Sequence, residues 1–507
     1  MFKRSLSAGI QGLVVIVLAS VNAEGQINAW TNGSANWEDP HWTLGTPPSA
    51  GQTVYITNQG FKAVAINSTN SPESLTVSSI NLWGETNSFN LLLLNFSGFE
   101  KPLNTGLLNV GTNGAVTPLH ATLNVAGAIT IDGALNQGES AHVNAGSITV
   151  GTINTISTSY SQIGLYNLTN GMLQISGNLA VGGRGAFNQF DGAQTNGGIA
   201  LVGFDPQRTP FGIASFYLSN GIVSTPSISL DYATFTQTGG TNQVSGSVTV
   251  SSGSHLSTFI LNGGVLSSSN TTIDFTPGLF MQSAGVHIVT NLLRVSHPDN
   301  GSGYIQTGGQ LIAPNIQVNT GAAFHHDGGS VSNANLLTLG GQNSAWDEHT
   351  TGQQMGRLLL GDFASTLSLP SSACVLRFAN SSGVVWSNQA MLTIEHWNGS
   401  RIGGGQHQIY FGSDSTGLAP RQIGQIQFHN PAGYSGLAPA IILSTGEIVP
   451  ASLVQATRFG NALVLQFPAG ATLQTSTNVT GPYTDIQATN PYTNGLTDRL
   501  RFFRVKN

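Results

Sequence analysis

Two short segments in the second half of the chain contain the residue types that acid–base catalysis and metal binding use. They are His325-His326-Asp327 and, one segment later, Asp347-Glu348-His349. Imidazole and carboxylate groups can bind a metal ion or exchange protons near neutral pH, provided that the two segments meet on adjacent turns of a fold. Successive side chains of a strand point to opposite faces, so His325 and His326 cannot both reach one ligand without a bend. We therefore expect a turn that carries these polar side chains without a chemical role, and we assign no catalytic, cofactor-binding or metal-binding residue.

Carboxylates are too scarce to suggest a polysaccharide-cleaving enzyme, which needs a carboxylate pair, or a carboxylate with a basic residue and often calcium. From Gly221 to Gly340 the charged residues are few and spread along the sequence: Asp231, Asp274, Arg294, Asp299 and Asp327. Segment 299–303 has the composition of a calcium loop, but its single carboxylate favours a plain turn. We expect no lyase or glycosidase activity.

Aromatic and basic residues leave a glycan-binding alternative open. Trp346, Trp386 and Trp397 are candidate platforms on which sugar rings could stack. Near the C-terminus a set of basic residues could hold a sorting signal or an anionic surface glycan: Arg499, Arg501, Arg504 and Lys506. A solvated edge strand whose charges prevent aggregation explains the same basic residues, and we favour that interpretation.

The composition indicates a folded β-rich protein with an uncharged polar surface. Charged residues make up 7% of the 507 residues, where about 25% is usual, and the net charge is only -6. Recurrent Val, Ile, Leu and Phe exclude a disordered chain, so Ser, Thr, Asn and Gln must form the surface, where they can stack into ladders. Nucleic acid is excluded as a partner because phosphate binding needs clustered Lys and Arg. The single Cys374 cannot form an internal disulfide.

The first residues have the features of an export signal. Lys3 and Arg4 precede an apolar run from Ala8 to Leu18, and small residues at 21–23 suit signal peptidase. We expect residues 1–23 to be a signal peptide and the mature chain to be extracellular or on the outer cell surface. The apolar run is too short to span a membrane comfortably, and no later stretch is long enough either.

An internal repeat sets the expected fold. Each copy has an aromatic residue, a Gly five residues later, a turn and a short apolar-polar-apolar strand such as 248–250. The eight aromatic markers are Tyr166, Phe187, Phe216, Phe235, Phe259, Phe280, Tyr304 and Phe324. The eight marker glycines are Gly171, Gly192, Gly221, Gly240, Gly264, Gly285, Gly309 and Gly329.

This repeat length predicts an all-β protein that forms a right-handed parallel β-solenoid. A coil of about 20 residues with two or three strands closes one rung, and rungs pair at roughly 4.8 Å. The aromatic and apolar strand residues would then stack in columns inside, while the glycines would take the positive φ values that sharp corners need. A sandwich or a propeller is the competing architecture, but propeller blades need about 40 residues each. We expect a Trp-rich cap and first strands at 24–104, the solenoid at 105–370, a closing β region at 371–452 and a small β-strand module at 453–507.

Three stretches resemble large bacterial surface proteins that carry autotransporter-associated β-strand repeats. The first is 30–37 with 41–54, which is similar to their entry motif, and the second is the repeat itself, as in 235–240. The third comprises 378–383, 392–399, 408–412 and 442–447, which is similar to their closing region. The resemblance implies a surface location and a solenoid but no activity. No segment after Pro370 is long or regular enough for the membrane barrel of a true autotransporter.

Together these features favour a non-enzymatic structural or adhesin-like protein. Its expected partners are surface glycans or neighbouring surface proteins, without nucleic acid, a membrane-spanning segment or a cofactor. A carbohydrate-binding or polysaccharide-degrading β-helix is the alternative, since a fold alone never fixes function. Tryptophans lining an exposed groove beside carboxylates would favour the alternative, and buried tryptophans would favour the first.

Overall fold

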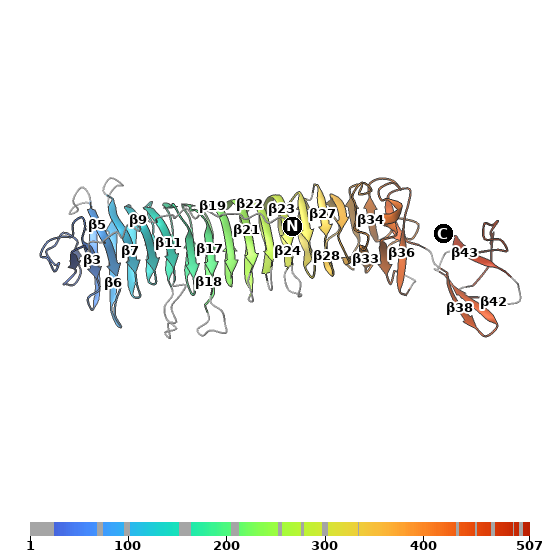
Figure 1. Cartoon of the computed structure of the whole chain (residues 1–507), viewed down its shortest axis with the longest axis horizontal. Coiled ribbons are helices and arrows are strands. Elements are labelled where there is room, and N and C mark those ends of the chain that lie inside the picture. The colour runs from blue at the N-terminus through green and yellow to red at the C-terminus, as the bar shows by residue number, and fades with distance from the viewer. Residues whose placement is uncertain are drawn as a thin grey trace, which may run out of the picture.

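The alternation of apolar and polar residues in the sequence produces strands that are buried on one side and wound into parallel coils. The computed structural model describes residues 25–67, 75–95, 102–151, 164–203, 212–251, 256–274, 278–296, 303–332, 334–431, 435–451, 454–467, 472–489, 491–495 and 500–506. Strands make up 62% of the chain and helix 1%, and the stacked coils form a β-solenoid of about 14 turns (Figure 1). The predicted all-β parallel solenoid is confirmed. No helix in the described ranges is long and apolar enough to cross a membrane, and the expected signal peptide lies outside them.

Each coil contributes strands to three faces. We call the face with the sequence markers the aromatic face; its strands include β10 (Ala134–Gln137), β12 (Leu165–Leu168), β15 (Ala186–Gln189), β18 (Ala214–Leu218), β20 (Ala233–Gln237) and β28 (Ser344–Glu348). The second face includes β13 (Met172–Ile175), β16 (Ala193–Thr195) and the first parts of β5 (Leu75–Leu82), β7 (Leu103–Val110), β9 (Thr122–Ile131) and β11 (His142–Val150). The third face includes β3 (Thr53–Ile56), β14 (Leu179–Gly182), β17 (Ile199–Val202), β25 (Asn315–Val318), β27 (Leu336–Leu339) and β30 (Arg357–Leu360).

Some strands are long because the chain passes from one face to the next without leaving the ladder. Examples are β19 (Ile222–Asp231), β21 (Thr241–Ser251), β22 (Ser257–Asp274), β23 (Gly278–Val295), β24 (Gly303–Ile312) and β26 (Ala323–Ser332). β-bulges mark several of the bends between faces, as between Val244 and Ser247. In these coils the chain therefore turns from one face to the next while its backbone stays hydrogen-bonded to the neighbouring coils.

The eight aromatic markers form one stack along the interior, as the repeat predicts. Consecutive rings lie 4.5–4.9 Å apart between centroids, and all eight side chains are buried. Trp346 adds a ninth ring, 4.3 Å from Phe324 and parallel to it within 3°. The same column continues in both directions with aliphatic residues, for example Leu135 before Tyr166 and Leu367 after Trp346. Parallel offset rings at this spacing add attraction beyond their buried area.

The marker glycines make the corners possible. All eight have positive φ, between 66° and 94°. At Gly264 a Cβ atom would lie 2.4 Å from the carbonyl oxygen of Gly240 in the preceding coil. Both the left-handed conformation and the close approach of coils therefore require glycine.

A column of glutamines runs beside the aromatic stack, two residues after the aromatic position. Gln189, Gln237 and Gln282 are completely buried and are separated by leucines in the coils between them. The Nε2 group of Gln237 donates to the carbonyl of its own marker, Gly240 (3.5 Å), and to that of Val265 in the next coil (3.0 Å). Each such glutamine thus satisfies backbone carbonyls at a corner and links two coils.

Buried side chains of neighbouring coils form a chain of hydrogen bonds in the interior. The Tyr304 hydroxyl donates to Gln282 Oε1 (2.6 Å) and lies 3.0 Å from His287 Nδ1, while His287 Nε2 lies 3.0 Å from Thr271 Oγ1. Because the tyrosine proton goes to Gln282, His287 must donate from Nδ1 and accept from Thr271 at Nε2. Burial lowers the pKa of His287 to about 3, so the ring is neutral at physiological pH.

The N-terminal end is covered by tryptophans. Trp30, Trp37 and Trp42 are buried and pack edge to face, with 4.9 Å between the Trp30 and Trp42 rings and 5.0 Å between the Trp37 and Trp42 rings. Parallel pairing already begins here, since β1 (Ile27–Ala29) pairs with β3, and β3 with β5. The coils therefore extend upstream of residue 105, where the aromatic marker is absent and aliphatic residues occupy its column.

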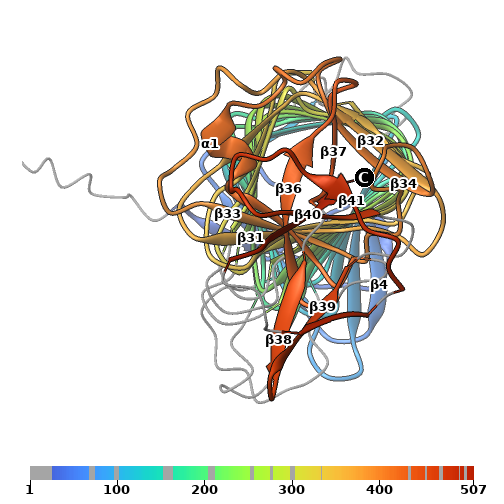
Figure 2. The same ribbon diagram turned by 90° about the vertical axis from the view of Figure 1, so that its right-hand side faces the viewer.

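At the other end, a change of strand direction stops the ladder. Parallel coils continue past residue 370 through β31 (Ala364–Ser368), β33 (Met391–Glu395) and β35 (Ile426–His429) on the aromatic face, and through β32 (Cys374–Phe378) and β34 (His407–Phe411) beside it. The hairpin of β36 (Leu437–Ile442) and β37 (Glu447–Pro450) then pairs antiparallel with β35 and β34 and lies over this end of the solenoid (Figure 2). Leu376, Phe378, Trp386 and Trp397 are buried here. Antiparallel strands occupy the edges that another chain could otherwise extend.

The C-terminal residues form a separate small β module. One sheet contains β38 (Gln455–Phe459), β39 (Ala462–Gln466) and β42 (Tyr492–Gly495); the other contains β40 (Thr472–Ser476), β41 (Thr484–Asp485) and β43 (Phe502–Lys506). Leu465, Phe467 and Leu473 form its own hydrophobic cluster.

Candidate functional site

The two histidine-rich segments meet on adjacent coils. β26 pairs in parallel with β28, so that His325 lies beside Asp347 and His326 beside Glu348. Asp327 is likewise hydrogen-bonded to His349. Each histidine therefore has a carboxylate partner in the neighbouring coil.

The middle pair is inside the solenoid, as strand alternation predicts. His326 and Glu348 are fully buried, with 2.8 Å between Nδ1 and Oε1, and Glu348 also accepts hydrogen bonds from Trp346 Nε1 (3.2 Å) and Thr350 N (3.0 Å). Burial raises the pKa of Glu348, but the hydrogen bond and charge of His326 and the other donors outweigh it and hold that pKa below its usual value. A substrate cannot reach these atoms, so the pair anchors two coils to one another.

The two outer pairs also join neighbouring coils by hydrogen bonds. His325 Nδ1 lies 2.9 Å from Asp347 Oδ2, and this hydrogen bond raises the pKa of His325. Two coils further on, Glu395 and His429 make another such pair at 2.6 Å. Within the described ranges no three His, Cys, Asp or Glu side chains come together as a metal site would require. The segments form a seam of hydrogen-bonded histidine–carboxylate pairs between coils.

A hollow of about 680 Å³ lies beside this seam, with His349, His396 and His407 in its lining. His407 is buried and already engaged, because Nδ1 accepts from the backbone of Asn398 (2.9 Å) and Nε2 donates to the carbonyl of Ser372 (2.9 Å). Both ring nitrogens of His407 are therefore occupied, and His349, an exposed histidine of the lining, is hydrogen-bonded to Asp327 of the seam.

The three tryptophans considered as sugar platforms are buried. Trp346 is 1% exposed, Trp397 2% and Trp386 3%. Trp346 completes the aromatic stack, Trp397 packs edge-on against Phe428 at 5.3 Å, and Trp386 donates from Nε1 to the Leu358 carbonyl. The hypothesis that these residues stack on sugars is therefore wrong, because none presents a ring face to solvent.

The remaining candidates are the basic residues of the C-terminal module and the segment 299–303. In the C-terminal module Arg504 donates to Gln474 Oε1 (2.6 Å) and lies over the Tyr483 ring at 4.1 Å. It therefore acts as part of the module's packing. Arg499 and residues 299–302 lie outside the described ranges.

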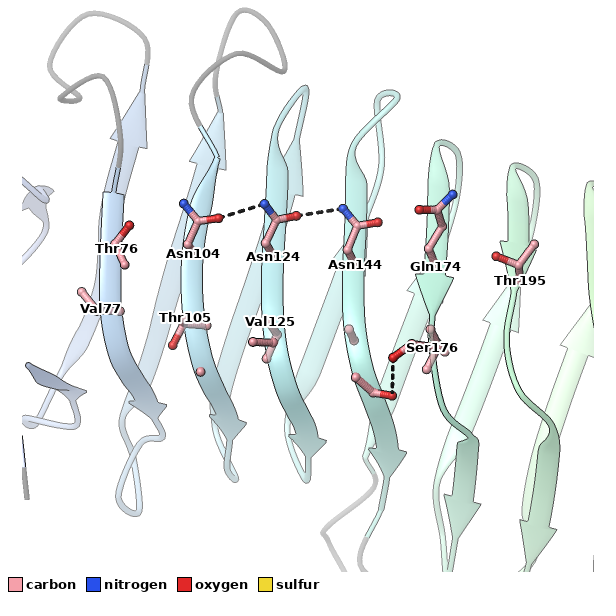
Figure 3. Close-up of a pocket in the computed structure, with 15 residues that line it drawn as sticks. Thr76, Val77, Asn104, Thr105, Asn124, Val125, Asn144, Gln174, Ser176 and Thr195 are labelled. Carbon is pink, nitrogen blue, oxygen red and sulfur yellow. Dashed lines mark hydrogen bonds between the residues drawn. The ribbon is translucent and has the colours of Figure 1, made fainter. Parts of the chain in front are cut away.

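The best-formed candidate is a groove on the second face, which sequence reasoning missed. It has a volume of about 760 Å³ and crosses the strands of six successive coils, β5, β7, β9, β11, β13 and β16 (Figure 3). One column of outward side chains runs along it: Thr76, Asn104, Asn124, Asn144, Gln174 and Thr195. The side chain of Asn124 donates to Asn104 (2.9 Å) and accepts from Asn144 (2.8 Å).

The base of the groove is formed where the coils bend. Val77, Val125 and Ile175 line it from the next position of each strand, and small residues such as Gly106 and Gly146 follow them. A Cβ atom at Gly146 would lie 2.7 Å from the backbone oxygen of Ala126 in the preceding coil, so glycine keeps the bend tight. All fifteen lining residues are uncharged. The groove can thus offer hydrogen bonds and aliphatic contact but no acid–base chemistry.

Comparisons with protein families, with curated proteins and with solved structures give no match. The resemblance to surface proteins with autotransporter-associated repeats therefore stays a prediction.

Proposed function

We propose that this protein is an extracellular or cell-surface scaffold of adhesin-like type that acts without catalysis. One observation carries this proposal: an uninterrupted parallel ladder of about 14 turns with a single continuous core. Neighbouring rungs lie about 4.8 Å apart, so the surface repeats the same side-chain positions at a fixed spacing over a long distance. Such a surface suits attachment to repetitive partners.

The surface chemistry supports attachment through many weak contacts. Amide ladders recur on different faces, for example Asn136-Asn167-Asn188 and Asn315-Asn335. The titratable residues of the seam at 325–349 are paired with one another. Weak uncharged contacts repeated over several coils gain affinity through multivalency.

The expected export signal at residues 1–23 and the resemblance to bacterial surface proteins support the location. Antibodies raised against the purified chain should label intact source cells, and external protease should remove the label. Label that appears only after permeabilisation would refute a surface role.

Catalysis is tested separately on soluble polysaccharides. We expect no release of reducing ends or unsaturated products. Product release that Asp327→Asn or Glu348→Gln abolishes would overturn the non-enzymatic part of the proposal and would identify the histidine seam as a catalytic site.

A further inference from the structure

The amide ladder of the groove has unused hydrogen-bonding capacity. Each Asn side chain has two N–H donors and an oxygen with two lone pairs. In the described ranges the Asn124 ladder bonds use one N–H of Asn124 and one lone pair of its oxygen. Asn144 donates one N–H to Asn124, and its other groups are not used in the ladder as described. The middle of the groove therefore offers both a donor and an acceptor from successive coils.

The groove also has the shape of a site for an elongated ligand. Six coils at about 4.8 Å each give a length of about 24 Å between the first and last rungs. The volume of about 760 Å³ lies in the range of small-molecule binding sites. Val125 and Ile175 are buried beneath the amides, so the accessible apolar surface of the groove comes from small residues such as Ala126, which is exposed in its lining.

Charge and backbone pairing narrow the class of ligand. An acidic glycan would find no cation among the fifteen lining residues. An extended peptide commonly binds by adding a strand to an open sheet edge. Strand β9 has no open edge here, because it pairs with β7 on one side and β11 on the other.

We propose that this groove binds an uncharged, extended β-linked polysaccharide that lies along the solenoid axis. Its hydroxyl groups would bond to Asn124, Asn144 and Gln174, and its C–H faces would lie against small residues of the lining such as Ala126. The rung spacing is close to the rise of one sugar unit in such a chain, so successive sugars lie beside successive rungs. This inference rests on the proposed adhesin-like function and names its ligand class.

The chain provides a matched control for the ladder. Asn167 is the centre of a second three-residue ladder, on the aromatic face, where it donates to Asn136 (2.8 Å) and accepts from Asn188 (2.9 Å). Asn124→Ala and Asn167→Ala therefore each remove two equivalent side-chain hydrogen bonds from an Asn ladder, but only Asn124 lies in the groove. A third variant, Ala126→Trp, fills the groove from an exposed position in its lining and leaves both ladders intact.

Isothermal titration of the purified chain with cellohexaose, and with hexagalacturonate as the acidic counterpart, tests the proposal. We expect cellohexaose to bind, Ala126→Trp to weaken it at least tenfold, Asn124→Ala to weaken it about fivefold to tenfold, and Asn167→Ala to leave it unchanged. Circular dichroism should show all three variants folded.

Absence of cellohexaose binding, tighter binding of hexagalacturonate, or equal weakening by the two Asn variants would overturn the proposal. If cellohexaose does not bind but antibodies still label the protein on intact cells, the proposed ligand of the groove is wrong and the scaffold function stands. Loss of the surface label would remove the scaffold function itself.

Discussion

Tyrosine in place of phenylalanine should stabilise the solenoid in some coils and destabilise it in others. The two tyrosines of the stack show why. The hydroxyls of Tyr166 and Tyr304 each donate at 2.6 Å to the buried glutamine of the preceding coil, Gln137 and Gln282. Where the next aromatic is phenylalanine, that glutamine oxygen has no hydrogen-bond partner, as at Gln237 before Phe259.

The coil before Phe259 has room for a second contact. Asn242 is fully buried and neither its oxygen nor its nitrogen has a hydrogen-bond partner. It occupies the same column as His287, which contacts the Tyr304 hydroxyl. A hydroxyl at position 259 would therefore lie between Gln237 and Asn242, as that of Tyr304 lies between Gln282 and His287. One or two new buried hydrogen bonds should stabilise Phe259→Tyr by about 1–2 kcal/mol.

Phe280 is the matched control, one coil further along. The corresponding positions in its preceding coil are Leu261 and Leu266, so a hydroxyl there would be buried without a partner. Burial of an unpaired hydroxyl costs about 1–3 kcal/mol. Phe259→Tyr and Phe280→Tyr add the same atom to the same stack, yet their free energies of unfolding should differ by about 3 kcal/mol.

Urea unfolding measures this difference, with hydrogen exchange in β22 and β23 as the local readout, because repeat proteins can open coil by coil. The denaturant slope should be unchanged in both variants. If the two substitutions shift stability in the same direction and by the same amount, the orphaned glutamine oxygen does not control the effect and the reasoning fails.

Three further predictions concern the core, a corner and the ends. Burial lowers the pKa of His287 in the folded protein to about 3, so between pH 6.5 and pH 3 only the unfolded chain binds a proton at this residue. The free energy of unfolding should therefore fall by about 1.4 kcal/mol for each pH unit in that range. His287→Leu, which introduces the residue type of both its column neighbours, should reduce this slope in urea melts between pH 7 and pH 4, and an unchanged slope would contradict the assignment. Gly264→Ala should cost about 2 kcal/mol or more because of its positive φ and close coil contact, whereas Gly383→Ala, with open space at its Cβ, should be neutral in the same melts; equal effects would argue against a conformational role. Removal of residues 24–60 should expose the first rung and cause aggregation, whereas removal of residues 453–507 should leave a monodisperse solenoid in light scattering; the reverse result would show that the ends are covered by other residues.

The fold could be predicted because the eight copies of the repeat can be aligned with one another in the sequence. An aromatic five residues before a glycine fixes both the inward position and the corner, and the stack from Tyr166 to Phe324 follows directly. Trp346 escaped that pattern because residue 351, five positions later, is Thr and the nearby glycine is Gly352. The upstream coils escaped it because Leu92 and Val116 fill the same column without an aromatic ring.

The groove could not be predicted from the same information. Its ladder depends on the pairing of Asn104, Asn124 and Asn144, and these lie in coils that carry no marker. Bulges on β7, β9 and β11 also shift the register between faces, so outward positions cannot be counted from a strand at the next face. By contrast, the glutamine column was visible in the sequence, since Gln189 and Gln237 each follow an aromatic marker by two residues. A polar residue at an inward position was a signal of a structural hydrogen bond.

The interior polar residues also explain how nearly equivalent coils keep one register. A stack of interchangeable phenylalanines could slip by one coil with little loss of buried area, because every rung would again meet an aromatic neighbour. The polar pairs prevent this equivalence: Gln189 with Gln194, Gln237 with Asn242 and Gln282 with His287 occur in alternate coils, and leucine or valine occupies the coils between. A slip of one coil would place an apolar side chain at each corner where a buried glutamine now donates hydrogen bonds. Backbone carbonyls such as that of Val265 would then have no donor. Unpaired buried groups cost about 1–3 kcal/mol each, so several such losses exceed what uniform aromatic stacking recovers.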